Sequence, residues 1–258
     1  MSDWNEYSER HCQFYGNTLP QMLLACLKSR QWDSLLDLGC GDGSLLYALE
    51  KSGMILDKTL YAVDISEDRV KKARAVSPRT HFYVSTAEHI PDIRDRSIDI
   101  LVSTQVIEHV PDDRAMVSEV SRVLSDGGLA YVSTVYKRRG AWYFYRGRNG
   151  WAIDPTHTRE YTNDEQLLKH FRDFGLKIVQ NQKTRIRRSI LGSTVLGRIG
   201  APKDVIVRSR FLRFMVGLSF PVPGYYIWEL VCVRDGGEGS APGTVMAGSK
   251  LVGSPSSF

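Results

Sequence analysis

The chain has 258 residues, of which 42% are hydrophobic and 24% are charged. It contains no run of eighteen apolar residues, so we predict no transmembrane helix, and its first residues lack the pattern of a secretory signal. The four cysteines form no CxxC pair and no zinc spacing. These features predict a reduced, cytoplasmic protein with one sizeable domain.

Strands and helices are expected to alternate along most of the chain. Residues 3–30 have helical spacing, with Pro20 opening a second helix. Seven apolar runs are expected to be strands, at 34–40, 59–66, 80–86, 98–104, 128–135, 176–183 and 225–235. Helices are expected at 43–53, 66–76, 111–124 and 162–175. This alternation predicts βαβ units, and therefore an α/β fold whose parallel sheet has helices on both faces.

Three segments depart from the alternation. Residues 137–161 form an aromatic, glycine-rich loop. Residues 183–224 mix basic and apolar residues: nine Lys or Arg lie between Lys183 and Arg213, against Asp204 as the one acid. Residues 236–258 are rich in Gly, Ser and Ala, which is typical of disorder. We predict one domain over residues 1–235, with the loop and a basic apolar lobe as parts of it, followed by a disordered tail.

The first expected strand leads into the sequence DLGCGDG, at residues 37–43. Glycine is costly inside regular elements, so three glycines at alternate positions indicate that something approaches the backbone closely. A glycine-rich turn after the first strand of a doubly wound sheet is where nucleotide-like ligands bind. The spacing differs from the GxGxxG of dinucleotide enzymes, and no Gly-Lys-Ser/Thr phosphate loop is present, which argues against an oxidoreductase and an NTPase.

Four motifs occur in order between residues 34 and 134: LLDLGCGDGS, YAVDIS, TAEHIP, and STQVIEHVPD followed by VLSDGGLAYVS. With these motifs the chain resembles the class I S-adenosylmethionine-dependent methyltransferases. It is most similar to the methyltransferase type 11 group, which includes ubiquinone and menaquinone biosynthesis enzymes. The resemblance implies a doubly wound, mostly parallel, seven-stranded Rossmann-like sheet with one antiparallel strand near the C-terminus. It also implies S-adenosylmethionine as the cofactor.

The resemblance assigns cofactor contacts to the carboxyl ends of the first strands. Asp37 would accept a hydrogen bond from the ammonium group, Asp64 would bind the ribose hydroxyls, and Ile65 would lie against the adenine. For Asp64 the alternative is helix capping, although Ser66 already fills that need. Thr86 stands where many relatives have Asp. The complete predicted set is Asp37, Gly39, Cys40, Gly41, Gly43, Asp64, Ile65, Thr86, Ala87, Glu88 and Gln105.

Methyl transfer in this fold takes place beside the segment QVIEHV, at residues 105–110. An oxygen acceptor must lose a proton, so we predict His109 as the general base, with Glu108 orienting it or contacting the substrate. The alternative is that His109 only packs beside Pro111. Some ubiquinone-pathway relatives bind a metal here through two Glu and the His. Gln105 replaces the first Glu, and a neutral amide is a poor ligand for a hard cation, so we predict no metal.

The loop at 137–161 is expected to form part of the acceptor pocket. The segment HTREY resembles one found in many relatives, and we predict that the acceptor is bound by Tyr136, His157, Arg159 and Tyr161. The alternative is that Arg159 and Glu160 attach the loop to the sheet.

The basic apolar lobe, residues 183–224, suits an anionic lipid-like surface. We therefore predict a small or amphiphilic acceptor, such as a quinone-like, lipid-like or glycolipid molecule, and peripheral association with anionic membranes. Alternatives are a solvated charged face, a methyltransferase acting on a nucleic acid or a protein, and a non-catalytic S-adenosylmethionine-binding scaffold. No RNA-binding module is visible, which argues against nucleic acid.

Overall fold

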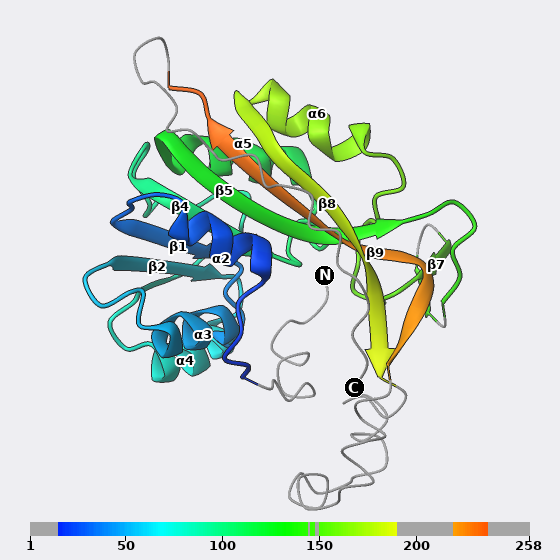
Figure 1. The fold of residues 1–258 in the computed structure, drawn as a ribbon, viewed down its shortest axis with the longest axis horizontal. Coiled ribbons are helices and arrows are strands. Elements are labelled where there is room, and N and C mark those ends of the chain that lie inside the picture. The colour runs from blue at the N-terminus through cyan, green and yellow to red at the C-terminus, as the bar shows by residue number, and fades with distance from the viewer. Residues whose placement is uncertain (1–14, 144, 148–149, 190–218, 237–258) are drawn as a thin grey trace, which may run out of the picture.

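The structure is a computed structural model, and it describes residues 15–143, 145–147, 150–189 and 219–236. Its strands form one large sheet and one small hairpin (Figure 1). The strands are β1 (Ser34–Leu38), β2 (Thr59–Asp64), β3 (His81–Val84), β4 (Ile98–Thr104), β5 (Leu124–Lys137), β6 (Tyr145–Gly147), β7 (Gly150–Ala152), β8 (Leu176–Ser189) and β9 (Ser219–Arg234). The helices are α2 (Gln21–Lys28), α3 (Ser44–Ser52), α4 (Glu67–Val76), α5 (Asp113–Val123) and α6 (Glu165–Asp173).

The large sheet has seven strands in the order β3-β2-β1-β4-β5-β9-β8. The first five in this order pair in parallel, while β9 runs antiparallel to both of its neighbours. The predicted mostly parallel, seven-stranded sheet with one antiparallel strand is therefore confirmed. Parallel strands point their carboxyl ends toward the same edge, which brings the segments after β1, β2 and β4 together.

Helices cover both faces of the sheet because adjacent residues of a buried strand point to opposite sides. Leu35 of β1 belongs to a core with residues of α2, α3 and α4. Leu36, the next residue, belongs to the opposite core with residues of α5 and α6. The continuous apolar run of β1 follows from this double burial, since neither face of the strand contacts solvent.

Most helix ends follow their local sequence. Ser66 caps α4 by accepting a hydrogen bond from the Arg69 backbone N–H, and Gly53 ends α3 with a φ of 70°. The expected helix at 111–124 ends earlier, at Val123, and β5 begins at Leu124. The reason is tertiary: Leu124 is fully buried and pairs with Ile98, so the Asp-Gly-Gly segment that follows lies inside an irregular strand.

The two ends of the predicted basic apolar lobe, residues 183–224, belong to strands of the large sheet. Residues 183–189 continue β8, and residues 219–224 belong to β9, with which β8 pairs. The two long strands reach past the rest of the sheet (Figure 1) and pack there with the 137–161 loop around Val135, Ile153, Val222 and Tyr225. Lys183 forms an ion pair with Asp164 at 2.6 Å and lies over the rings of Tyr136 and Trp228. Part of the basic charge is therefore neutralised within the fold.

Several predictions fall outside the described residues. These are the first part of the expected N-terminal helical region, the middle of the lobe at 190–218, and the tail after Gly236. Within the described ranges, α2 begins directly after Pro20, as expected. No helix in these ranges is long and apolar enough to cross a membrane.

Candidate functional site

A cavity of about 480 Å³ lies at the carboxyl ends of the parallel strands. The predicted cofactor residues line it with one exception, and Arg69, which the sequence did not single out, joins them. It is also bounded by the 137–161 loop through Ile153, Asp154 and His157. The predicted residues that line it are Asp37, Gly39, Cys40, Gly41, Asp64, Ile65, Thr86, Ala87, Glu88, Gln105 and His109.

The three glycines after β1 all have positive φ, which explains their residue type. A Cβ on Gly39 would lie 2.3 Å from a methyl carbon of Val106, and one on Gly43 would lie 2.9 Å from the Cα of Ala73. The glycines were predicted because something must approach their backbone closely. At Gly39 and Gly43 that neighbour is the protein itself, through Val106 and Ala73. Gly43 does not line the cavity, so its predicted contact with the cofactor is replaced by packing against α4.

Asp64, the last residue of β2, holds the glycine loop against the sheet. Its Oδ2 accepts a hydrogen bond from the Gly41 N–H at 2.8 Å, and its Oδ1 accepts one from the Ser66 N–H at 3.0 Å. Two carboxylate oxygens offer about four acceptor positions, so each oxygen keeps capacity for a further hydroxyl. Asp64 thus combines the predicted position at the cavity with the alternative, structural role.

Asp37 lies at the head of the loop and is 1% exposed. Its Oδ2 is fully buried and has no hydrogen-bond partner among the described residues. Burial, together with the nearby charge of Asp64, raises the pKa of Asp37 to about 8. A buried acceptor without a donor is unfavourable. A bound cation or N–H group that donates to this oxygen would therefore be stabilised.

The segment after β4 carries the predicted catalytic residues. Gln105 has a φ of 55° and a buried amide nitrogen without a partner among the described residues. Glu108 is completely buried: its Oε2 accepts a hydrogen bond from Thr134 at 2.8 Å, while its Oε1 has no partner in the same ranges. Burial raises the pKa of Glu108 to about 7, against the opposing effects of His157 and Thr134.

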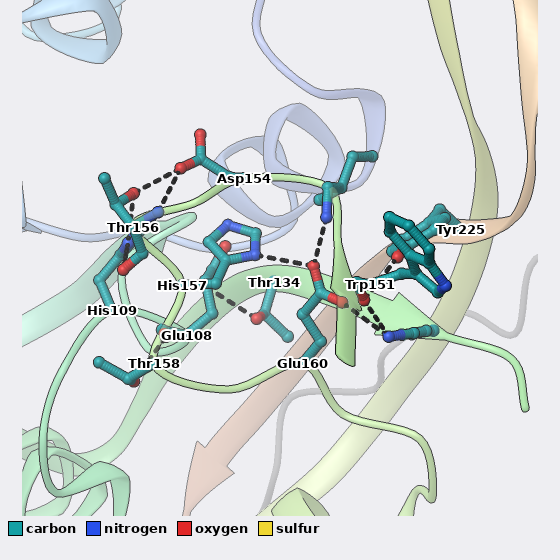
Figure 2. Close-up of polar contacts among 12 residues, drawn as sticks. Glu108, His109, Thr134, Trp151, Asp154, Thr156, His157, Thr158, Glu160 and Tyr225 are labelled. Carbon is teal, nitrogen blue, oxygen red and sulfur yellow. Dashed lines mark hydrogen bonds and ion pairs between the residues drawn. The ribbon is translucent and has the colours of Figure 1, made fainter. Parts of the chain in front are cut away.

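His109 and His157 both line the cavity, and their side chains lie close together (Figure 2). Their ring centroids are 4.8 Å apart with an interplanar angle of 70°. Burial, followed by the charge of His157, lowers the pKa of His109 to about 4, so His109 is neutral near pH 7. The sequence placed these residues in separate roles, as a base and as an acceptor ligand, but the fold joins them in one cluster with Glu108.

Three of the predicted acceptor residues do not line this cavity. The guanidinium group of Arg159 donates to the carbonyl oxygens of Ile107, Val110 and Pro111, at 3.2, 2.7 and 2.6 Å. It therefore attaches the 137–161 loop to the segment after β4, which was the structural alternative. Tyr161 is 3% exposed and donates to Asp113, so it belongs to the core.

Tyr136, the third of these residues, is also used inside the fold. Its hydroxyl donates to the Thr162 carbonyl oxygen at 3.1 Å, and Lys183 lies over its ring. Of the four predicted acceptor residues, His157 is the one that lines the cavity.

A second, more open cavity of about 1090 Å³ adjoins the first. The two share a wall at the carboxyl end of β4 and the start of α3, made of Ser44, Leu45, Thr104, Gln105 and Ile227. Its other lining residues come from the start of α2 and from β8 and β9, including Gln180, Gln182 and Glu229. Gln105, whose amide nitrogen has no partner among the described residues, thus lines both cavities.

Comparison with known proteins finds similarity over part of the chain. A family model described as a methyltransferase domain matches residues 36–132. A probable S-adenosylmethionine-dependent methyltransferase of Mycobacterium tuberculosis is 35% identical over 131 residues, which cover 51% of this chain and 44% of the relative. A ubiquinone biosynthesis O-methyltransferase of Idiomarina loihiensis is 32% identical, with coverage of 52% and 58%. The chain thus spans about half the length of the curated relatives it matches.

Solved structures agree with the fold. The YcgJ protein of Bacillus subtilis superposes with a TM-score of 0.57 at 20% identity, covering 84% of this chain and 97% of that chain. A geranyl diphosphate methyltransferase solved with S-adenosylmethionine superposes with a TM-score of 0.54 at 16% identity, covering 83% of each chain. The chain thus has the fold of these solved proteins, and over about half its length its sequence is similar to S-adenosylmethionine-dependent methyltransferases.

Proposed function

We propose that this protein transfers the methyl group of S-adenosylmethionine to an oxygen atom of a small or amphiphilic acceptor. The observation that carries the proposal is the buried carboxylate oxygen of Asp37 at the head of the glycine loop, which has no partner in the part of the chain that the structure describes. It lies in the same cavity as His109 and His157. The cofactor's ammonium group would supply the donor that Asp37 lacks, so the donor set of the site fits this cofactor.

At the cofactor end, Asp37 would hold the ammonium group and Asp64 the two ribose hydroxyls. Ile65 is 47% exposed and would cover the adenine ring, beside Thr86 and Ala87. When bound, the cofactor supplies a methyl group activated by a positively charged sulfur, which leaves as a neutral thioether when the acceptor oxygen bonds to the methyl carbon. The protein's task is to align the acceptor and to exclude water.

At the acceptor end, His109 and His157 give the cavity a polar wall, and the buried Glu108 precedes His109 in the chain. The neutral ring of His109 can accept a hydrogen bond from an acceptor hydroxyl, and its role as the general base stays a prediction. The shared wall with the second cavity gives a longer acceptor a place to extend. Relatives named ubiquinone biosynthesis O-methyltransferase and malonyl-[acyl-carrier protein] O-methyltransferase support an oxygen acceptor attached to a longer molecule.

The first test is calorimetric binding of S-adenosylhomocysteine to the whole protein, with NAD as the negative control. We expect binding of the former alone. Asp64→Asn keeps an acceptor oxygen in the loop but loses the charge that binds two hydroxyls, so it should weaken binding about tenfold or more. Asp95→Asn, at an exposed position outside the cavity, is the matched control and should bind normally. Normal binding by Asp64→Asn would contradict the assignment of the ribose site.

Turnover separates the enzyme from a non-catalytic scaffold. The purified protein would be incubated with labelled S-adenosylmethionine and an extract of lipids and quinones, and label would be measured in the organic phase. His109→Ala should abolish labelling and keep the affinity for S-adenosylhomocysteine. Cofactor binding without labelling of lipids, nucleic acids or proteins would favour the scaffold.

A further inference from the structure

Glu108, His109 and His157 form a compact cluster of ligand-type side chains. One oxygen or nitrogen atom from each lies within 4.8 Å of those of the other two. Two of these residues follow β4 and the third comes from the 137–161 loop. Arg159 and Thr158 attach that loop to the backbone around Glu108 and so help to bring the three side chains together. Thr158 contributes two bonds to the Glu108 carbonyl oxygen, at 2.9 Å from its N–H and 2.8 Å from its hydroxyl.

Both imidazole rings are oriented by an oxygen atom behind them (Figure 2). Nδ1 of His109 lies 3.3 Å from the Thr156 carbonyl oxygen, and Nδ1 of His157 lies 3.1 Å from the Glu160 carboxylate. A carbonyl oxygen only accepts, so Nδ1 of His109 carries the hydrogen, and the same tautomer suits His157 beside its carboxylate. Nε2 then carries the lone pair in each ring. This arrangement is the usual one for metal-binding histidines.

The partners behind the rings are themselves held in place. Glu160 also accepts the Ile153 N–H at 2.7 Å and lies 3.5 Å from the Lys137 ammonium. Thr156 is held by Asp154, whose carboxylate accepts bonds from its N–H and its hydroxyl. Each ring is therefore positioned by a second, hydrogen-bonded layer, which a histidine that merely fills space does not need.

Glu108 supplies an independent observation. The residue is completely buried, Thr134 engages one carboxylate oxygen, and the other, Oε1, has no partner among the described residues. Leaving such an oxygen unpaired is unfavourable, and more so if it is charged. A cation bound between this oxygen and the two rings would satisfy it.

We propose that Glu108, His109 and His157 bind one divalent transition-metal ion of the zinc type. Two imidazoles and one carboxylate suit borderline ions such as Zn²⁺ and Co²⁺, whereas Mg²⁺ and Ca²⁺ prefer oxygen ligands throughout. Three protein ligands leave a fourth position, and the cavity lies beside it, so water or an acceptor oxygen could complete the coordination. The site does not depend on the proposed methyl transfer.

This proposal reverses the sequence prediction of no metal. That prediction considered the segment after β4 alone, where Gln105 replaces a carboxylate. The third ligand comes instead from His157, which is 48 positions from His109 in sequence and was assigned to the acceptor. A metal-bound His109 cannot also be the general base, so the two roles of this residue exclude each other.

The test is metal binding to the tag-free, chelator-treated whole protein, with Zn²⁺ followed by calorimetry and Co²⁺ by visible absorption. We expect one equivalent of each, with Co²⁺ bands that indicate nitrogen ligands. Glu108→Gln and His157→Gln should each weaken binding at least tenfold. Glu160→Gln removes the carboxylate behind the ring of His157 and its ion pair with Lys137, but keeps an amide oxygen that can accept the Ile153 N–H; it should weaken metal binding about 10–100-fold. His89→Asn, an exposed histidine outside the cluster, should bind as the wild type does.

Binding of S-adenosylhomocysteine is measured on every variant and shows whether the cofactor end is still folded. Metal binding that is absent in the wild type, or equal in the wild type, Glu108→Gln and His157→Gln, overturns the proposal. If Glu108→Gln or His157→Gln fails to fold, the metal affinity of Glu160→Gln and the Co²⁺ spectrum of the wild type test whether the cluster binds the metal. A protein that binds metal but not S-adenosylhomocysteine would contradict the proposed function and keep the metal site.

Discussion

At the scale of single residues, two buried carboxylates account for much of what this site can do. Asp37 and Glu108 are both almost or completely buried, and each has one oxygen atom without a partner among the described residues. Asp37 lines the cavity, and Glu108 precedes His109, which also lines it. Stable cores avoid such groups, so both carboxylates indicate that ligands complete them. These carboxylates destabilise the ligand-free fold and favour the binding of a ligand.

Asp37→Asn should stabilise the empty protein and weaken cofactor binding. The pKa of Asp37 is raised to about 8 in the folded state, from 3.8. Between these values the native state binds more protons than the unfolded state, so stability falls as the pH rises toward 8. Asn removes this dependence. We expect the variant to gain on the order of 1–3 kcal/mol at pH 8 and to bind S-adenosylhomocysteine about 10–100-fold more weakly.

The measurements for Asp37→Asn are urea unfolding between pH 5 and 9 and calorimetric binding. The wild type should lose stability relative to the variant over this range. Parallel stability curves for the two proteins would show that Asp37 is charged in the empty site.

Gly39→Ala should destabilise the protein more than Gly53→Ala. Both glycines have positive φ, at 82° and 70°, so both variants carry the same backbone cost of about 1–2 kcal/mol. The new Cβ at Gly39 also meets Val106 at 2.3 Å, while nothing lies within 4 Å at Gly53. The difference in unfolding free energy isolates the clash, and equal losses would show that the loop can move away from Val106.

At the scale of elements, the site is assembled by attaching one loop to another. Arg159 uses its planar guanidinium group to bind the carbonyl oxygens of residues 107, 110 and 111, and Thr158 binds that of Glu108. Because the 137–161 loop brings His157 to His109, its attachment decides whether the cluster exists at all.

Arg159→Lys should loosen this attachment. An ammonium group cannot reach three carbonyl oxygens at once, so we expect a loss of about 1–3 kcal/mol in unfolding free energy. Metal binding at the histidine cluster should weaken, while S-adenosylhomocysteine, which we propose binds around Asp37 and Asp64, should keep its affinity. Arg96→Lys, which alters one exposed ion pair with Asp126, is the control. Unchanged stability in Arg159→Lys would show that water replaces the lost bonds.

The ends of helices and strands were predicted correctly where the local sequence sets them, and wrongly where strand pairing sets them. Ser66 and Gly53 end their helices as expected, because capping and positive φ are local properties. The helix before β5 was expected to run on to Leu124, and β8 was expected to end at Lys183. Pairing of Leu124 with Ile98, and of β8 with the start of β9, overrode both expectations. Such contacts join residues that no window of sequence places together.

At the scale of the whole molecule, the edge strand β8 of the large sheet carries exposed basic residues. Arg185 and Arg187 are exposed on β8, and Phe220 on the paired strand β9 is 56% exposed. A basic surface with an exposed aromatic residue suits an anionic lipid surface, which would also deliver an amphiphilic acceptor. Association with membranes stays a prediction.

That prediction is tested by sedimentation with lipid vesicles. We expect binding to vesicles that contain anionic lipid, weak binding to neutral ones, and loss of binding at high salt because the charges are screened. Arg185→Glu with Arg187→Glu should reduce binding several-fold. Lys71→Glu with Lys72→Glu, on α4 near the other edge of the sheet, is the matched control. If both double variants lost vesicle binding equally, the binding would depend on the protein's net charge and not on this surface.

The sequence by itself determined the sheet, the glycine loop and the acids at the ends of β1 and β2. Each of these depends on short patterns: buried apolar runs, glycines at positive φ, and polar residues directly after a strand. Only the tertiary structure decided which distant side chains meet. In the structure, Arg159, Tyr136 and Tyr161 make contacts within the fold and do not line the cavity. His157 lies beside Glu108 and His109. The physical reason is that loop attachment and burial depend on contacts between residues some 50 positions apart, whose side chains have no periodic pattern to reveal them.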